Sequence, residues 1–142
     1  MKYKKFNNNY ILRIDKGEEI VESLFEFIKI EKIKLANVSG IGASNHIEMG
    51  LFDTKEKKYY SKVFKGDFEI TSLLGNISTM DDKPYLHLHI SLANKDQKMF
   101  GGHLNKAIIS GTLELFITAI DNKIDRKFDN DVGLNLLEFK ND

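Results

Sequence analysis

One segment of this chain, residues 18–32, has the apolar spacing of an amphipathic helix, and most of the chain after residue 32 alternates as strands do. Asp15 and Glu18 match a capping box just before it, with Asp15 as the expected N-cap. The remaining pattern favours short strands, roughly seven to nine of them. The sequence therefore predicts an α+β fold with one main helix and a mostly antiparallel sheet. One stripe of the helix carries the apolar side chains expected to pack on that sheet: Ile20, Val21, Leu24, Phe25 and Ile28.

The length and the turn signals of the chain indicate a single domain. A chain of 142 residues is of ordinary single-domain size, and no segment rich in Pro, Gly or Ser interrupts it. We expect residues 1–9 to form a flexible polar lead-in and residues 10–142 to form the domain. Within the domain, residues 40–42 (Gly-Ile-Gly) predict a tight turn, and residues 75–84 predict a loop.

Several classes of site are excluded by what the sequence lacks. It has no Cys, so it has no disulfide, no thiolate nucleophile and no Cys-based zinc or iron–sulfur site. Walker A, H-E-x-x-H and G-x-S-x-G motifs are also missing. No apolar run approaches the roughly 18 residues of a membrane span, and the first residues lack a signal-peptide core. These features predict a cytoplasmic protein without membrane association.

The charges of the chain are balanced, which bears on nucleic-acid binding. Its 21 Lys and Arg match 21 Asp and Glu, so the net charge gives no general attraction to a phosphate backbone. Only Arg13 and Arg126 are arginines, although guanine recognition and minor-groove insertion both favour Arg. The composition argues against a dedicated DNA reader and leaves a local basic patch open.

The alternation Leu-His-Leu-His-Ile at residues 86–90 is the strongest indication of chemistry. Alternate residues of a strand share a face, so His87 and His89 point together to the side opposite the apolar residues. Their Cβ atoms are expected about 6–7 Å apart, which lets both imidazoles bind one divalent ion. His103 can supply a third ligand, because the Gly-Gly pair before it lets the backbone approach closely. Three imidazoles and an open fourth position are typical of catalytic zinc.

Alternatives to this interpretation stay open at the level of spacing. Histidines on a solvated strand need no metal, and His46 is expected to be an ordinary strand residue. Arg13 lies on an otherwise apolar strand, where it either pairs with an acidic residue or holds an anionic ligand. Glu48, Glu69 and Glu114 alternate with apolar residues, so one of them could face the histidines as a base or fourth ligand. The candidate catalytic residues are therefore Arg13, Glu69 and Glu114.

Short motifs stand in a specific order along the chain. They are YILRID around Arg13, GEEI at 17–20, VSGIGA at 38–43, GDFEI at 66–70 with SLLGNIS at 72–78, PYLHLH at 84–89 and GGHL at 101–104. This ordered set resembles the plants-and-prokaryotes-conserved (PPC) domain family, in its stand-alone prokaryotic form, from about residue 10 to residue 139. The resemblance implies an α+β fold with a strongly curved antiparallel sheet, assembled as a homotrimer.

The resemblance also bears on ligands. Plant relatives carry an AT-hook before the domain and act as nuclear DNA-binding regulators, which implies AT-rich DNA as a partner. This chain has no Arg-Gly-Arg-Pro hook. Plant domains generally lack the H-x-H pair, whereas His87, His89 and His103 look like the prokaryotic branch that binds a metal. The fold is also similar to that of acetolactate decarboxylase, whose zinc is held by an H-x-H pair and a later His, so zinc is the expected metal.

Two classes of function are compatible with these features. The first is a homotrimeric, zinc-binding PPC protein with a DNA-binding, regulatory role, as the family label implies. The alternative is a metal-dependent small-molecule enzyme or metabolite sensor, in which the three-His site activates water or a substrate carbonyl. In the second class Arg13 would hold a small anionic ligand, and a nearby Glu would move protons. The residues favour the second class, and the resemblance favours the first.

Overall fold

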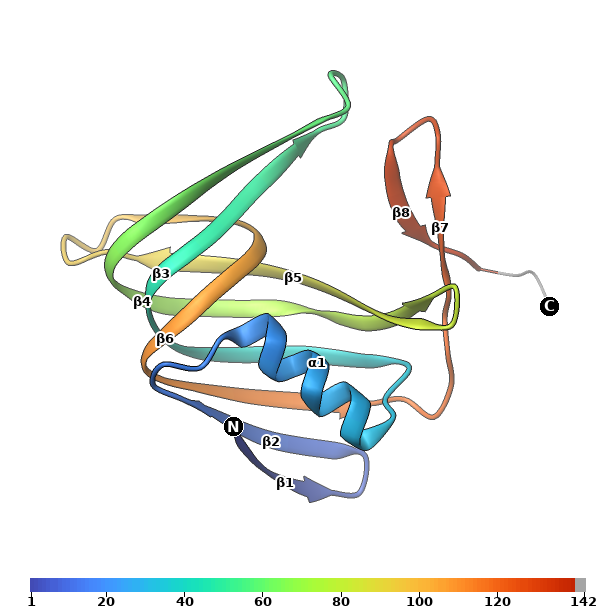
Figure 1. Ribbon diagram of the computed structural model, residues 1–142, viewed down its shortest axis with the longest axis horizontal. Coiled ribbons are helices and arrows are strands. Elements are labelled where there is room, and N and C mark those ends of the chain that lie inside the picture. The colour runs from blue at the N-terminus through green and yellow to red at the C-terminus, as the bar shows by residue number, and fades with distance from the viewer. Residues whose placement is uncertain (140–142) are drawn as a thin grey trace.

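Strands make up most of the molecule (Figure 1). The structure, a computed structural model, describes residues 1–139; the predicted domain of residues 10–142 thus ends with three residues outside the described part. The prediction of one α+β domain with a mostly antiparallel sheet is confirmed. The elements in chain order are β1 (Lys2–Phe6), β2 (Asn9–Asp15), α1 (Ile20–Glu31), β3 (Ala36–Asp53), β4 (Lys58–Met80), β5 (Lys83–Ala93), β6 (Met99–Ala119), β7 (Arg126–Asp129) and β8 (Leu134–Leu137).

The main sheet is strongly curved and closes on itself. Its strand order is β1-β2-β6-β3-β4-β5, and β5 also pairs with β6. The start of β6 pairs with the end of β5, between His89–His103 and Ala93–Met99, while its later part pairs with β2 and β3. Strands β3, β4, β5 and β6 therefore form a ring, and the sheet edge at β5 is covered by β6.

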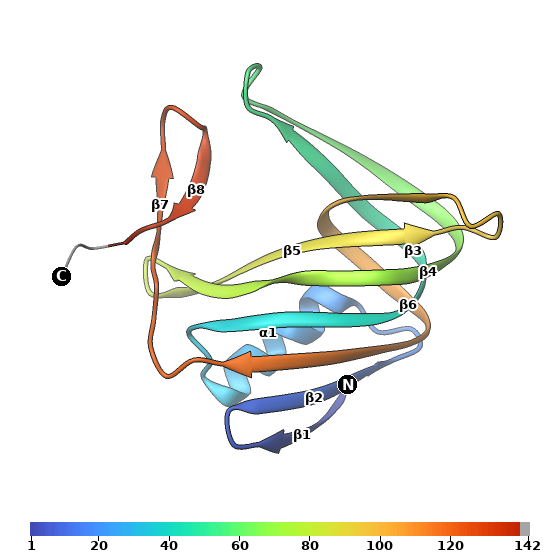
Figure 2. The same ribbon diagram turned by 180° about the vertical axis from the view of Figure 1, so that it is seen from behind.

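The helix covers one face of the sheet and leaves the other open (Figures 1 and 2). It runs from Ile20 to Glu31, inside the predicted residues 18–32. Phe25, expected in the packed stripe, is instead 41% exposed, and Phe27 is fully buried. At about 100° per residue, Phe27 falls within the arc of the helix surface that holds the buried residues, and Phe25 lies beyond the edge of that arc. The buried hydrophobic side chains of the helix are Ile20, Leu24, Phe27 and Ile28.

The expected capping box forms a turn instead of the helix cap. The Asp15 N–H donates to the Glu18 carboxylate at 2.7 Å, but Gly17 between them has a φ of 90°, which a helix does not allow. The N-cap is Glu19, whose carboxylate accepts the Glu22 N–H at 2.7 Å. Its other carboxylate oxygen accepts the Ala107 N–H of β6 at 2.9 Å, so one side chain both caps the helix and attaches it to the sheet.

Residues 1–9, expected as a flexible lead-in, contain a strand. β1 pairs with β2 over its whole length, from Lys2–Arg13 to Phe6–Asn9. Tyr3 explains this, because its ring packs edge-on against Phe27 at 5.1 Å and its hydroxyl donates to Glu31 at 2.7 Å. A single aromatic contact of this kind cannot be recognised from the sequence of a segment that is otherwise polar.

Two predicted breaks in the sheet are absent. Residues 40–42 form no turn: β3 passes straight through them, with irregular pairing between Gly40 and Gly42. A Cβ at either glycine would meet the backbone of β6, so these glycines allow close strand contact. Residues 75–84 are not a loop, because β4 continues to Met80 and β5 begins at Lys83. A two-residue turn with positive φ at both positions joins them.

Two hairpins extend from the sheet and frame the site. The end of β3 and the start of β4 form a long hairpin, called the arm below. Strands β7 and β8 form a separate two-stranded sheet opposite it (Figures 1 and 2). The Lys57 ammonium at the tip of the arm donates to the Asn130 carbonyl in the β7–β8 turn. In the described part of the chain, no helix has the length and apolar character of a membrane span. The cytoplasmic location stays a prediction.

Candidate metal centre

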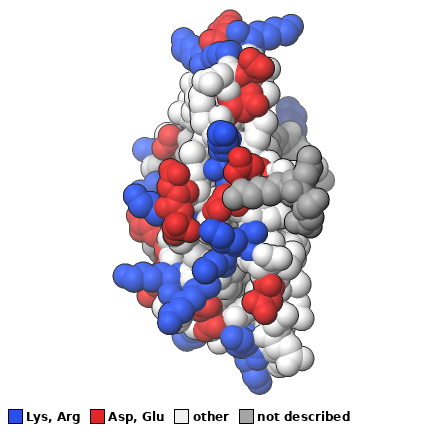
Figure 3. All heavy atoms as spheres, turned by 90° about the vertical axis from the view of Figure 1, so that its right-hand side faces the viewer, with Lys and Arg blue, Asp and Glu red and all other residues white. Residues whose placement is uncertain are grey.

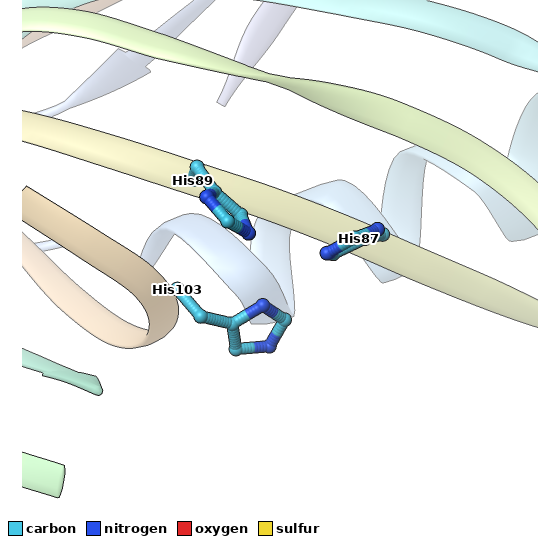
Figure 4. A group of neighbouring side chains, drawn as sticks. All are labelled: His87, His89 and His103. Atoms are coloured by element: carbon cyan, nitrogen blue, oxygen red, sulfur yellow. The ribbon is translucent and has the colours of Figure 1, made fainter. Parts of the chain in front are cut away.

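Strand β5 presents two histidines on the open face of the sheet. Leu88 and Ile90 are buried on the face of the sheet that the helix covers. The alternation of the strand therefore places His87 and His89 together on the opposite face. Figure 4 shows both rings projecting from β5 toward the ring of His103. The side chains of His87 and His89 therefore share one face of the strand, as the sequence predicts.

His103 is brought to this pair by the closure of the sheet. It lies on β6 directly opposite His89, as its Cα partner across the two strands. A Cβ at Gly101 would collide with the Ile90 carbonyl oxygen of β5, and one at Gly102 would lie 2.8 Å from the Gly50 carbonyl oxygen of β3. The two glycines let β6 pass between both neighbours, and this passage delivers the third imidazole.

The three imidazoles have the spacing of a metal-binding cluster. Their ring centroids lie 5.1, 5.2 and 5.5 Å apart, and one nitrogen from each ring lies within 4.8 Å of the other two. Nitrogens bound tetrahedrally to zinc at about 2.0–2.1 Å are about 3.3 Å apart, so small rotations of the side chains would close the cluster around an ion. His87, His89 and His103 could therefore hold a metal.

The surroundings keep two of these imidazoles neutral. Burial, reinforced by Arg126, His103 and His89, lowers the pKa of His87 to about 4. Burial, with His89 as a second cause, also lowers the pKa of His103. Metal ligation requires the neutral imidazole, so at neutral pH these rings are already in the ligand form.

A pocket of about 650 Å³ opens over the cluster. The arm supplies Leu51, Phe52 and Tyr59 to its wall, and the β7–β8 hairpin supplies Leu134 and Leu136. Phe52 also lies against the β7–β8 turn, since a Cβ at Gly133 would be 3.1 Å from its ring. The cluster thus faces a pocket lined largely by apolar side chains, as small-molecule sites generally are.

Arg126 enters the same pocket and was not predicted there. Its guanidinium donates from Nε to Ser78 Oγ, from Nη1 to the Asn135 carbonyl and from Nη2 to Asn76 Oδ1, each at 2.8 Å. Its carbon Cζ lies 4.7 Å from the ring centre of Tyr85. The sequence contains two arginines, Arg13 and Arg126, and gives no indication of which one lies at the site. The fold places Arg126 beside the histidines.

A polar chain leads away from His103 on the other side of the pocket. The Tyr59 hydroxyl donates to Asn105 Oδ1 at 2.8 Å, and the Asn105 amide donates to Glu48 at 3.4 Å. The ring of Tyr59 meets that of His103 edge-on at 6.2 Å. Burial raises the pKa of Tyr59, against the opposing effect of Asn105, so the phenol stays protonated. Glu48 is therefore connected to the site through the Asn105 amide.

The candidate catalytic residues lie elsewhere in this chain. Arg13 on β2 pairs with Asp15 at 2.7 Å, and Glu114 on β6 is the Cα partner of Arg13. Glu69 on β4 pairs with Ala93 at the far end of β5. None of the three lines the pocket above the histidines. His46 on β3 is outside the cluster, as expected.

Comparison with known proteins identifies the family. The family model of the Plants and Prokaryotes Conserved domain (abbreviated PCC or PPC) matches residues 1–121. The chain belongs to the PPC family. No curated protein matches this PPC chain.

Solved PPC structures share both its fold and its length. A protein from Bacteroides thetaiotaomicron called a "putative DNA binding protein" is 38% identical, with a TM-score of 0.94, over 97% of this chain and 96% of that one. A metal-containing protein from Archaeoglobus fulgidus is 34% identical, with a TM-score of 0.87, over 98% and 100%. A PPC protein from Pyrococcus horikoshii is 33% identical, with a TM-score of 0.85, over 99% and 95%.

The expected likeness to acetolactate decarboxylase is confirmed for the fold. The enzyme from Bacillus subtilis subspecies spizizenii is 17% identical, with a TM-score of 0.52, over 82% of this chain and 54% of the enzyme. At this sequence identity the comparison shows a similar fold and supports no conclusion about the chemistry of the site.

Proposed function

We propose that this PPC protein holds a divalent metal through His87, His89 and His103 and uses it to bind or convert a small molecule. The observation that carries the proposal is the convergence of three imidazoles, two kept neutral by burial, beneath an apolar pocket. The name of the metal-containing Archaeoglobus relative supports it. A metal there would supply Lewis acidity toward a bound water or carbonyl, and the pocket of this chain would orient the ligand and exclude water.

Zinc is the metal that the donor set favours. The cluster consists of three imidazole nitrogens, and no carboxylate of the described residues belongs to it. Calcium and magnesium prefer oxygen ligands, while three histidines with an open fourth position suit zinc. Thermal unfolding with added zinc tests this. We expect the melting temperature to rise with zinc and not with magnesium, and an equal response to both would contradict the choice of metal.

The proposed assembly is a homotrimer formed through the open face of the sheet. One cross-strand row on this face runs through Ile11, Phe116, Ser39, Leu74 and His89, each the Cα partner of the next. Phe116 is 57% exposed and Leu74 55% exposed, which is costly for large apolar side chains in a monomer. Because the row includes His89, an interface built on it would lie beside the histidine cluster.

DNA binding is a second candidate, favoured by the name of the Bacteroides relative. The charges give it less support: on the face in Figure 3, basic and acidic side chains are interspersed and form no field of one sign. The balanced total of 21 cations and 21 anions agrees with this distribution. Residues 1–142 contain no Arg-Gly-Arg-Pro hook for AT-rich DNA.

DNA affinity as a function of salt separates the two candidates. A protein that contacts phosphates loses affinity with a log–log slope of about −0.9 per contact. We expect no binding of an AT-rich duplex below about 10 μM even at low salt. Tight, salt-dependent binding that is unchanged in a His87→Ala, His89→Ala variant would favour the DNA role and disfavour the small-molecule role.

A further inference from the structure

Arg126 is a buried cation whose described partners are all uncharged. The residue is 8% exposed, and the three hydrogen bonds of its side chain go to a hydroxyl, an amide oxygen and a backbone carbonyl. Among the ion pairs of the described residues, none involves this guanidinium. A buried charge without a counter-charge is costly unless something else compensates it.

The guanidinium is also held in a fixed orientation with donors to spare. Guanidinium carries five N–H groups, and the three bonds use one at each nitrogen. Nη1 and Nη2 therefore each keep a second N–H, the fork that matches the two oxygens of a carboxylate. Stacking over Tyr85 fixes the plane of this fork.

The position of this fork relative to the histidines follows from the strand register. Asn76 and Ser78, which accept from Arg126, are the Cα partners of His87 and Tyr85 on β5. Arg126 thus lies beside the β4–β5 residue pair that contains His87, and the side chains of Arg126 and His87 line the same pocket. An anion on Arg126 and a metal on the histidines would be neighbours in one cavity.

We propose that the pocket binds a small organic carboxylate, with the carboxylate on Arg126 and an apolar substituent against Leu51, Phe52, Leu134 and Leu136. This rests on the proposed small-molecule role of the site and names its ligand class. The wall is apolar on the arm and hairpin sides and positive at one end, so it favours an acid with a short hydrocarbon part over an inorganic anion. Arg126, and not Arg13, is then the residue that holds the anionic ligand.

Calorimetric titration of the full chain, with and without zinc, provides the test. The probes are isovalerate, its neutral isostere isovaleramide, and inorganic phosphate at constant ionic strength. We expect isovalerate to bind at least about tenfold more tightly than either of the others, since the amide lacks the charge and phosphate lacks the apolar part. Equal binding of acid and amide would overturn the proposal, as would tighter binding of phosphate.

Variants assign the effect to Arg126. Arg126→Gln should lose isovalerate binding by at least about tenfold, while Arg13→Gln, which removes the other, exposed arginine, should leave it unchanged. Because Arg126→Gln also removes structural hydrogen bonds, Leu51→Glu serves as a second variant: Leu51 is 67% exposed, and a carboxylate there would repel the ligand without disturbing the core. Binding unaffected by Leu51→Glu and by a folded Arg126→Gln contradicts the proposal.

The outcome is distinguishable from a failure of the metal proposal. Zinc content of the same samples is measured independently, and the His87→Ala, His89→Ala variant removes the metal ligands while keeping Arg126. Isovalerate binding that persists in that variant supports the carboxylate site even if no zinc is found. Zinc binding without discrimination between acid and amide refutes the carboxylate site alone.

Discussion

His89 and His103 stand directly opposite each other across β5 and β6, with ring centroids 5.5 Å apart. This pairing exists because the start of β6 extends beyond its pairing with β2 and closes against β5. The histidine cluster is therefore a product of sheet closure, and changes that loosen the closure should alter the positions of the histidines.

Gly101→Ala should weaken both the fold and metal binding. The added methyl would meet the Ile90 carbonyl oxygen, which is backbone and cannot move aside without separating the strands. We expect a loss of about 1–3 kcal/mol in unfolding free energy, measured by urea denaturation, and a lower zinc affinity. Gly111→Ala on the same strand is the control, since its methyl would meet only the Ala43 side chain at an ordinary 3.6 Å. Equal effects of the two substitutions would argue against the closure as the source of the site.

Phe116→Lys should dissociate the proposed trimer. The proposed interface contains Phe116 in its apolar row, and a buried lysine there would be an unpaired charge. Light scattering should give about three times the chain mass of 16.3 kDa for the wild type and a single chain for the variant. Phe25→Lys, on the exposed side of the helix, should leave the trimer intact. A wild-type protein that is monomeric at micromolar concentration would rule out the trimer.

Low pH should remove the stability that Glu31 contributes to the contact between the β1–β2 hairpin and α1. Glu31 accepts hydrogen bonds from Tyr3, Tyr10 and Lys5, and the first of these is the main reason that its pKa is lowered. A carboxylate whose pKa is lower in the folded state stabilises the fold fully above its ordinary pKa near 4.5. That contribution is lost as the pH falls through the folded-state value.

The variant Glu31→Gln tests this linkage. At pH 7 it should lower the melting temperature by roughly 2–4 °C, and its stability should fall less steeply than that of the wild type below pH 4.5. Glu26→Gln, on the solvated side of the same helix, should match the wild type. Parallel pH profiles for Glu31→Gln and wild type would show that Glu31 carries no such linkage.

The sequence predicts the parts of this protein that depend on local periodicity. The helix and the shared face of His87 and His89 both follow from the spacing of apolar residues along one element. His103 was reachable as well, because a Gly-Gly pair before a histidine signals close backbone approach. The error at Phe25 arose at the edge of the helical stripe, where periodicity gives little discrimination.

Features that depend on contacts between distant elements were not predictable. β1 is held by Tyr3 on Phe27, and Gly40 lies within a strand because β6 passes against it. Arg126 belongs to the pocket because the chain entering β7 is attached to the end of β4, with Thr79 and Asp125 as the bridging residues. Nothing in the local sequence distinguishes Arg126 from Arg13, which lies on the surface beside Asp15.

The metal content of the purified protein tests the central claim most directly. Elemental analysis after zinc reconstitution should give up to one zinc per chain for the wild type and for His46→Ala, since His46 is outside the cluster. The His87→Ala, His89→Ala variant should retain none, because a single imidazole cannot hold the ion against a chelator. A wild-type protein without metal, or a double variant with the same zinc content as the wild type, would contradict the account.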